Sequence, residues 1–506
     1  MICAGMARIS IGPQQSRNAP EHHLATLTRR PGVPQQPAHA VVHGTDLNVP
    51  PLARRLAQSC MSPAFELDVL LADKARTCLQ DLIGCAFESL GKPWSQQAQA
   101  LAAPMASVAP AVPGGLRGAT VIGQAQAVSP LDAAFVNAVM GHGLVREDMH
   151  SASISHLGVA VLPAVLALSQ QVRVSGRELL SAVVVGYEVG ARVGRALMDA
   201  RIARVFRPTG ITGPLAAAAA GSRLLGLTVE QTTHALALAA NTVGGFNEWG
   251  HTGGSEMYFH VGHAARNGVS SVLLARAGAF GSPTALDGQA GLFASHGKRE
   301  QAAGVNLFDG GAEIMSVYHK PVPACNFAQT ATQAALALAQ GGQCPVDQIR
   351  SITIRVPSAG AHYPGCDFRG PYAHVLQAKM SIQYNVVAAL MRAGVTEANF
   401  ELLQDPTLHA LLACTRLEID DDMTRAYPGH QGGGVEVTLQ DGRRLYKRLA
   451  DVVNASPQEV YERFRSAAQA VVGPARAEQI GTLLDGLERL DDAGQLAAAL
   501  APEASS

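Results

Sequence analysis

The stretch Gly141–Ala164, with the sequence GHGLVREDMHSASISHLGVAVLPA, concentrates residue types that carry out acid–base chemistry. Eleven consecutive residues contain Arg146, Glu147, Asp148, His150 and His156. An apolar run, Leu157–Leu168, follows directly. Ionisable groups beside a buried apolar segment are the setting in which pKa values move far from normal. The pattern therefore predicts an active site, although polar residues followed by an apolar run also describe a loop that enters a buried helix.

Five further polar residues are candidates for a site: Arg207, His251, His260, Lys320 and Tyr384. Arg207, in FRPTG, precedes a small-residue helix, where backbone N–H groups and a guanidinium suit a carboxylate. Lys320 lies where two domains should meet, and such boundaries are preferred ligand sites. His251 sits in the glycine-flanked loop WGHTGG, and His260 lies at the start of a helix. Each also has an ordinary structural interpretation. Arg207 could simply precede a helix, Lys320 could be a solvated charge, and His251 could lie in a loop without function. His260 could be a structural histidine whose hydrogen bonds are all made, and Tyr384 could pack in the core.

The composition excludes several classes of protein. The chain has 506 residues, a formal net charge of −1 and no block of Lys and Arg, so we expect no nucleic-acid partner. Its eight cysteines form no CxxC pair and no Cys/His spacing typical of zinc, which indicates free thiols in a reducing compartment. No secretory signal is apparent, and the apolar stretches are too short to span a bilayer, so we expect a cytoplasmic protein without a membrane partner.

The pattern along the chain predicts a mainly α protein. Residues 1–55 lack apolar periodicity and are interpreted as a flexible extension. Apolar spacing typical of helices begins at Phe65 and continues to about residue 319, with capping boxes at Ser175 and Thr228. Residues 320–455 contain alternating strand patterns and an Asp-Gly hairpin signal. Helical spacing returns over 456–500. An α+β domain inserted into an all-α domain is therefore expected.

Taken in order, these segments resemble the MmgE/PrpD family from about Phe65 to about residue 480. The resemblance is carried by the GH…EDMH…HLGVAVLPA block, SGRELLSAVVVGYEVG, FRPTG, Leu224–Ala239, FHVGHAARNG, KPVP and AKMSIQYN. It implies a large all-α domain, built from both ends of the chain, and a smaller α+β lid. It also implies a homodimer, no metal and no organic cofactor. Family members act on small di- or tricarboxylates.

The resemblance also assigns roles to residues. His156 matches the family's catalytic histidine, Tyr384 its tyrosine and Lys320 its lysine at the lid edge, while Glu147, Asp148 and His150 fall on the family's D-F-D-D-T-H pattern. The resulting catalytic set is His156, His150, Asp148 and Tyr384, and the substrate-binding set is Arg207, Lys320, Glu147, His260 and His251.

Three positions depart from the family pattern. Val145 stands where its first Asp is expected, Arg207 replaces the His of F-H-P-T-G, and Met257 replaces a Lys three residues before His260. Losing a carboxylate and a cation while gaining a guanidinium changes how substrate carboxylates are held.

The expected function is a cofactor-independent lyase that moves a proton next to a carboxylate, with hydro-lyase chemistry of the kind that dehydrates 2-methylcitrate favoured. The alternatives are an epimerase or isomerase, with His150 and His156 as its two bases, a decarboxylase, or a diverged binding protein without catalysis.

Overall fold

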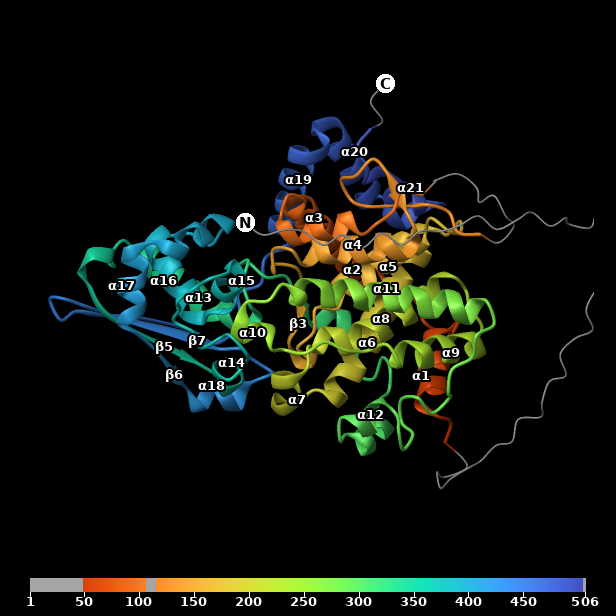
Figure 1. The fold of residues 1–506 in the computed structure, drawn as a ribbon, viewed down its shortest axis with the longest axis horizontal. Coiled ribbons are helices and arrows are strands. Elements are labelled where there is room, and N and C mark those ends of the chain that lie inside the picture. Colours follow the sequence, from red (N-terminus) through yellow and green to blue (C-terminus); the bar gives the residue numbers. More distant parts are fainter. Residues whose placement is uncertain (1–48, 106–114, 504–506) are drawn as a thin grey trace, which may run out of the picture. The chain divides into compact units, whose positions relative to one another are not determined.

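The computed structural model describes residues 49–105 and 115–503, and the fold below is that of the unit that begins at Pro50. Of the predicted extension, residues 1–55, the part up to residue 48 lies outside the described residues. The last residues of the extension belong to a helix, because α1 begins at Leu52. The described residues are mainly helical, as predicted (Figure 1).

The first part of this unit is built almost entirely from helices. They are α1 (Leu52–Cys60), α2 (Val69–Ser89), α3 (Pro93–Ala100), α4 (Pro130–His142), α5 (Gly158–Leu168), α6 (Gly176–Leu197), α7 (Ala200–Val205), α8 (Pro208–Leu224), α9 (Val229–Ala240), α10 (Trp249–Thr252), α11 (Glu256–Arg276) and α12 (Leu292–Ser295). The capping boxes predicted at Ser175 and Thr228 are confirmed at the starts of α6 and α9.

Helix α8 lies in the middle of this helical part and packs against α5, α6, α9 and α11. Small residues permit the close approach. A Cβ added to Gly186 of α6 would lie 2.8 Å from the Cβ of Ala220, and one added to Gly190 would lie 2.8 Å from the Cβ of Ala216. Such contacts leave no room for larger side chains. Helix α8 begins at Pro208, directly after Arg207, because proline is favoured in the first turn of a helix.

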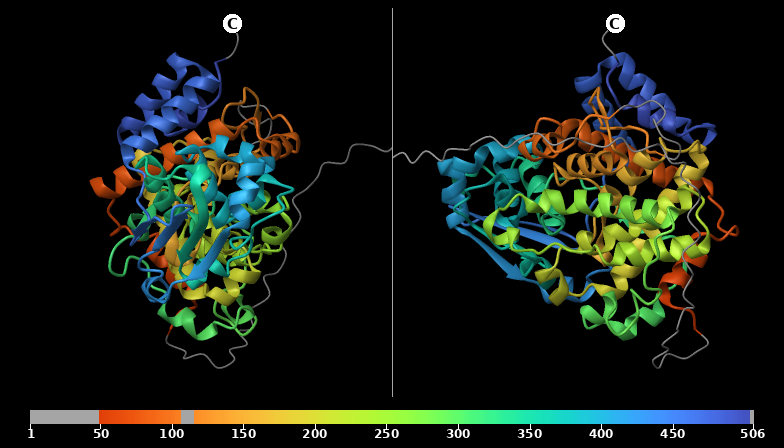
Figure 2. Two further views of the ribbon diagram at one scale, coloured as in Figure 1. Left: turned by 90° about the vertical axis from the view of Figure 1, so that its left-hand side faces the viewer. Right: turned by 45° about the vertical axis from the view of Figure 1, so that its right-hand side comes forward.

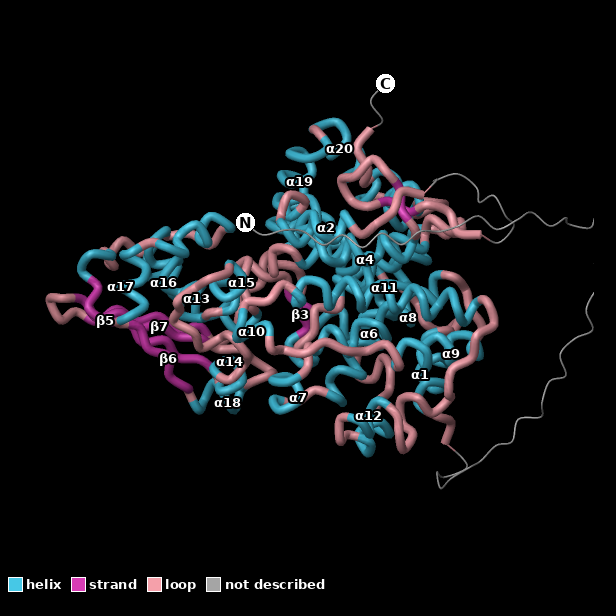
Figure 3. Tube along the Cα trace, viewed as in Figure 1, coloured by secondary structure: helices cyan, strands magenta, loops and turns pink. Residues whose placement is uncertain are grey.

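Four of the eight strands among the described residues form one sheet in the second part of the chain (Figure 3). Its order is β6-β5-β7-β8, with β5 (Ile349–Val356) parallel to β6 (Thr415–Ile419) and antiparallel to β7 (Gly433–Leu439). The predicted hairpin at Asp-Gly joins β7 to β8 (Arg444–Leu449), with Gly442 at φ +88°. Helix α13 (Gln329–Gln340) packs against β7 and β8. The remaining helices here are α14 (Ser358–Ala361), α15 (Val375–Met380), α16 (Ile382–Arg392), α17 (Pro406–Ala413) and α18 (Asp421–Ala426).

The C-terminal helices α19 (Pro457–Val472), α20 (Pro474–Asp485) and α21 (Gly494–Ala499) return to the helical part (Figure 2). Helix α19 packs on α2 so closely that a Cβ on Gly84 would lie 2.9 Å from the Cα of Phe464. Two short strand pairs complete the structure: β1 (Ala119–Thr120) with β2 (Ala127–Val128), and β3 (Met149–His150) with β4 (Val317–Tyr318). The division into domains at residues 320 and 455 stays a prediction. Among the described residues, no helix combines the length and apolar character needed to cross a membrane.

Candidate active site

The ionisable run lies in the connection between α4 and α5, and residues 141–150 are all buried. Strand β3 lies in this connection and pairs with β4, so Met149 and His150 are held against Tyr318 and Val317. Val145 and Ile154 have φ values of 56° and 52°, in the left-handed region that β-branched residues rarely adopt. Such backbone strain persists where surrounding structure imposes it, and it concentrates at functional sites.

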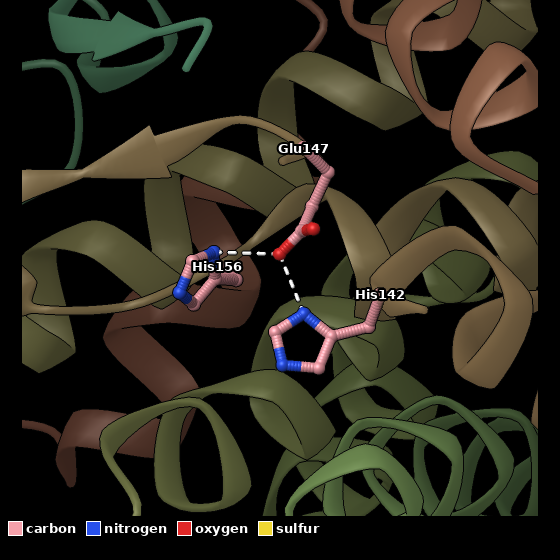
Figure 4. A group of neighbouring side chains, drawn as sticks. All are labelled: His142, Glu147 and His156. Atoms are coloured by element: carbon pink, nitrogen blue, oxygen red, sulfur yellow. Dashed lines mark hydrogen bonds and ion pairs between the residues drawn. The ribbon is translucent and has the colours of Figure 1, made fainter. Parts of the chain in front are cut away.

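Glu147 is the centre of the cluster that this connection builds (Figure 4). Its Oε1 lies 2.5 Å from Nδ1 of His142 and 2.8 Å from Nδ1 of His156. All three side chains are nearly inaccessible to solvent. One carboxylate oxygen thus faces two imidazole rings, with His142 coming from the last residue of α4 and His156 from the approach to α5.

The hydrogen bonds define the protonation of His142. Arg207 Nη2 lies 3.0 Å from Nε2 of His142, and a guanidinium can only donate. Nε2 is therefore the acceptor, and Nδ1 carries the proton that is donated to Glu147. Met257 Sδ lies 2.9 Å from the same Nε2. His142 is consequently neutral and links the Arg207 guanidinium to the Glu147 carboxylate.

His156 is neutral with the same tautomer. Its Nδ1 lies 3.1 Å from the backbone oxygen of Asp148 as well as beside Glu147, so both neighbours of Nδ1 are acceptors. Its backbone N–H donates to Thr209 Oγ1 at 3.0 Å, which ties it to α8. Nε2 has no hydrogen-bond partner among the described residues. An imidazole whose Nδ1–H is held by acceptors presents Nε2 as a base.

The pKa values agree with this assignment. Burial, with Lys320 acting in the same direction, lowers the pKa of His156 to about 3. Burial also lowers the pKa of His142. Although burial opposes it, His142, Lys320 and His156 together hold the pKa of Glu147 well below its usual range. The cluster therefore consists of one carboxylate and two neutral imidazoles.

His156 borders a small internal cavity of about 20 Å³. The helical part and the segment 325–380 both contribute to its wall, which consists of Val145, Met149, Ile154, His156, Arg207, Trp249, Met257, Cys325, Asn326, Phe327, Tyr363 and Met380. A space of this size holds about one water molecule, since a water needs about 10–15 Å³ on the same measure. The cavity is therefore closed to any carboxylic acid until its walls separate.

Arg207 is the cation on this wall. It is 4% exposed, and its guanidinium lies 5.4 Å from the ring centre of Trp249 and 3.4 Å, through Nη1, from the hydroxyl of Tyr363. His260 lies beside it on α11, and burial together with Arg207 lowers the pKa of that histidine to about 4. Helix α11 begins at Glu256, so His260 lies within it and not at its first residue.

Lys320 is fully buried and is not one of the residues that line the cavity. Its Nζ donates to the backbone oxygen of Val145 and lies 3.4 Å from that of Ala324. Burial lowers its pKa, and the Glu147 carboxylate opposes that shift. His251 lies exposed on α10.

Three of the predicted catalytic residues are held elsewhere by other partners. His150 Nε2 lies 3.0 Å from Glu313 Oε2. The Asp148 carboxyl accepts from the hydroxyl of Tyr187, and burial raises its pKa. Tyr384 donates its hydroxyl to the backbone oxygen of Asn399 at 2.9 Å. None of the three lines the small cavity, although the backbone of Asp148 contacts His156.

Sequence reasoning did not select His142 or Tyr363. A signal for His142 exists, because it ends a helix five residues before Glu147 within the same polar block. Tyr363 offered no local signal, since it lies in a loop far along the chain and reaches Arg207 only through the fold.

The donor set His142, Glu147 and His156 also has the composition of a metal site, and its ligand atoms lie within 4.8 Å of one another. Zinc accepts two histidines and a glutamate. Metal binding at Nδ1 would, however, require both Nδ1 protons to leave and Arg207 to release Nε2 of His142. The observed hydrogen bonds suit a proton-holding cluster better than this metal site.

Comparison with known proteins identifies the family. Human cis-aconitate decarboxylase is 28% identical over 72% of this chain and 78% of its own length. The cis-aconitate decarboxylase-like protein oryM of Aspergillus oryzae is 28% identical over 86% of this chain and 94% of its own. The 2-methylcitrate dehydratase of Cupriavidus necator is 28% identical over 76% of this chain and 81% of its own length. A lyase-type reaction on a polycarboxylate fits these relatives. Residues 35–304 match the MmgE/PrpD N-terminal domain and residues 322–488 the C-terminal domain, so the chain belongs to the MmgE/PrpD family.

Proposed function

We propose that this protein is a lyase that removes a proton next to a carboxylate of a small acid, with His156 as the base and Arg207 as the carboxylate ligand. The observation that carries the proposal is the unpartnered Nε2 of a neutral imidazole beside a cavity that also contains a buried guanidinium. Negative charge that develops beside a carboxylate is the main barrier to such reactions, and a nearby cation stabilises it.

The hydro-lyase form of the reaction needs an acid as well as a base. Tyr363 lines the same cavity, and burial raises the pKa of its phenol, which keeps the proton in place. In this scheme His156 Nε2 takes the C–H proton, and the C–H electron pair forms the carbon–carbon double bond. The C–O bond breaks, and the Tyr363 proton joins the leaving hydroxide to give water. Proton return from His156 to Tyr363 through solvent restores both groups.

Entry of substrate requires the cavity to open. Cys325, Asn326, Phe327, Tyr363 and Met380 come from the sheet-containing part of the chain, while His156 and Arg207 come from the helical part. We propose that the former acts as the lid expected from the sequence. Its movement would admit the acid, and its return would exclude water from the reacting atoms.

The experiment is proton exchange in D2O, followed by NMR, with cis-aconitate, 2-methylcitrate, 2-methylsuccinate and hexanoate as separate probes. Deuterium incorporation, water loss or CO2 release that disappears in His156→Gln supports the proposal. His430→Gln, at an exposed position outside the cavity, is the control and should retain activity. CO2 release without dehydration would favour the decarboxylase named among the relatives over the hydro-lyase.

A second candidate function is a binding protein without catalysis, which is favoured by Val145 and Met257 on the cavity wall, where the family pattern has Asp and Lys. Saturable binding of an acid with no exchange, no bond cleavage and no inversion would favour that alternative. The geometry gives less support to two-base epimerisation by His150 and His156, because His150 is bonded to Glu313. The homodimer and the cytoplasmic location stay predictions; light scattering on the purified protein would test the first.

A further inference from the structure

Arg204 and Arg207 are two cations three residues apart, and each borders a different cavity. Arg207 lies on the wall of the cavity of about 20 Å³ described above, which we call the inner cavity. Arg204 lies in the last turn of α7 and borders a larger, outer cavity of about 210 Å³. Ile154, Phe327 and Tyr363 form part of both walls, so the two cavities adjoin. Because Arg204 is exposed, the outer cavity lies between the inner cavity and solvent.

Neither arginine is paired with a carboxylate among the described residues. The Arg207 guanidinium contacts a neutral imidazole, a phenol, a thioether and an indole ring, and its Nε has no hydrogen-bond partner. Asp199, the acidic residue nearest to Arg204 in the sequence, pairs with Lys298 at 2.7 Å. The residues that line the two cavities include no Asp or Glu. Two positive charges are therefore left for the carboxylates of a ligand.

The chain between the two arginines is held in place by Asn247. Its Nδ2 donates to the backbone oxygens of Ala203 at 2.7 Å and of Phe206 at 2.9 Å. The backbone N–H of Arg207 donates to the backbone oxygen of Gly245 at 2.9 Å. Three residues of chain span at most about 11 Å between Cα atoms. Two long side chains that start this close together, from a fixed backbone, can converge on one small acid.

The wall between the two cavities comes mainly from the other part of the chain. Phe327 and Tyr363 belong to the sheet-containing part, whereas both arginines belong to the helical part. The two rings lie 5.3 Å apart, and the Tyr363 hydroxyl lies 3.4 Å from Nη1 of Arg207. Movement of the proposed lid would therefore join the cavities and leave the spacing of the arginines unchanged.

We infer that Arg204 is a specificity-determining residue that binds the second carboxylate of the substrate, while Arg207 binds the first. The inference rests on the proposed function and deepens it, because it names the residue that selects acids with at least two carboxylates. A guanidinium binds a carboxylate through two parallel hydrogen bonds, so each arginine fixes the orientation of one end of the acid. An acid held in this way places its middle carbons beside Tyr363, the proton donor of the proposed reaction.

Adipate and hexanoate test the inference as a matched pair, because they share six carbons and differ by one terminal carboxylate. In isothermal titration of the full chain, adipate should bind at least about threefold more tightly than hexanoate. Arg204→Gln should weaken adipate binding about three- to tenfold, as expected for a charge-assisted contact at an exposed position, and should change hexanoate binding less than about twofold. Arg204→Lys should keep part of the preference because it keeps the charge. Arg207→Gln should weaken both acids.

Arg201→Gln is the matched control. Arg201 is exposed on the same helix and carries the same charge, but it donates to the backbone oxygen of His296 and lines neither cavity. This variant should bind adipate as the unaltered protein does, which separates a direct contact from a general effect of charge. Added sodium chloride should reduce the preference for adipate in the unaltered protein more than in Arg204→Gln, since salt screens an exposed charge. Circular dichroism of each variant identifies any that fails to fold.

Several results would overturn the inference. They are an absence of adipate binding, adipate binding no tighter than that of hexanoate, an equal loss in Arg201→Gln, and full adipate affinity in folded Arg204→Gln. Binding is measured without turnover, so the inference and the proposed function can fail separately. Exchange of a polycarboxylate that disappears in His156→Gln but keeps its KM in Arg204→Gln would overturn the inference alone. A preference for adipate that depends on Arg204, without exchange of any probe, would overturn the proposed function alone.

Discussion

Replacement of Glu147 by glutamine tests the proton-holding cluster most directly. The Glu147 Oε1 lies 2.8 Å from Nδ1 of His156, so its charge stabilises the imidazolium that forms when Nε2 accepts a proton. A unit charge at that distance contributes about 6 kcal/mol at an effective dielectric constant of about 20. Since about 1.4 kcal/mol corresponds to a factor of ten in rate, the loss of kcat is bounded at about 10⁴-fold. The amide retains a dipole, so we expect a loss of about 10²–10⁴-fold.

The assay is the initial rate of deuterium incorporation into the best probe acid, with urea unfolding measured in parallel. Glu313→Gln is the matched control, because Glu313 is also buried and also contacts a histidine, His150, but lies outside the cavity wall. The control should keep kcat even if its stability falls. If the two variants lose activity equally, or if Glu147→Gln retains full kcat, the reasoning is refuted.

The remaining predictions concern His156, Arg207, Gly158 and the donor set. Because burial lowers the pKa of His156 to about 3, kcat/KM should show no histidine limb near pH 6.5, and a limb there would contradict the assignment. The same lowered pKa makes the free energy of unfolding depend on pH: it is highest above about pH 6.5, the pKa of histidine in the unfolded chain, and falls as the pH falls toward 3. The midpoints of urea unfolding measured across that pH range would show this loss of stability. Arg207→Lys should raise KM or Kd at least tenfold, because an ammonium group cannot make the two parallel hydrogen bonds that a planar guanidinium makes to a carboxylate. Unchanged binding would show that the substrate carboxylate lies elsewhere. Gly158→Ala should lower both stability and kcat, since its Cβ would lie 2.7 Å and 2.8 Å from the two Asp148 carboxyl oxygens; normal values of both would show that Asp148 can shift freely. Exhaustive treatment with EDTA should leave activity unchanged, and loss restored by zinc would instead support a metal on His142, Glu147 and His156.

Local patterns predicted the elements of this fold well. The helices α6 and α9 start at the residues that their capping boxes indicate, and the Asp-Gly turn marks the β7–β8 hairpin, because these signals depend on a few neighbouring residues. Helix α11 begins at Glu256, four residues before the predicted start at His260, because Glu256–Phe259 lacks the small-residue spacing that begins at His260.

The site was less predictable because its contacts join distant parts of the chain. His156 and Glu147 share one polar block, and the structure does bring them together. The contacts of Arg207 with His142 and Tyr363 depend on how α4, α8 and the loop after α14 pack, which no local pattern encodes. Tyr384 was selected by a motif, but the structure directs its hydroxyl to Asn399 instead of the cavity.

The closed cavity beside His156 has a kinetic consequence. A space of about 20 Å³ must widen for every substrate molecule that enters and every product that leaves. Loop and domain openings of this kind take microseconds to milliseconds and often limit turnover. We therefore expect kcat to fall as solvent viscosity rises, and a substrate deuterated at the reacting carbon to turn over at nearly the normal rate. In that regime the packing between the two walls limits turnover of the unaltered protein, and proton transfer to the imidazole becomes limiting only in variants such as Glu147→Gln that slow the chemical step.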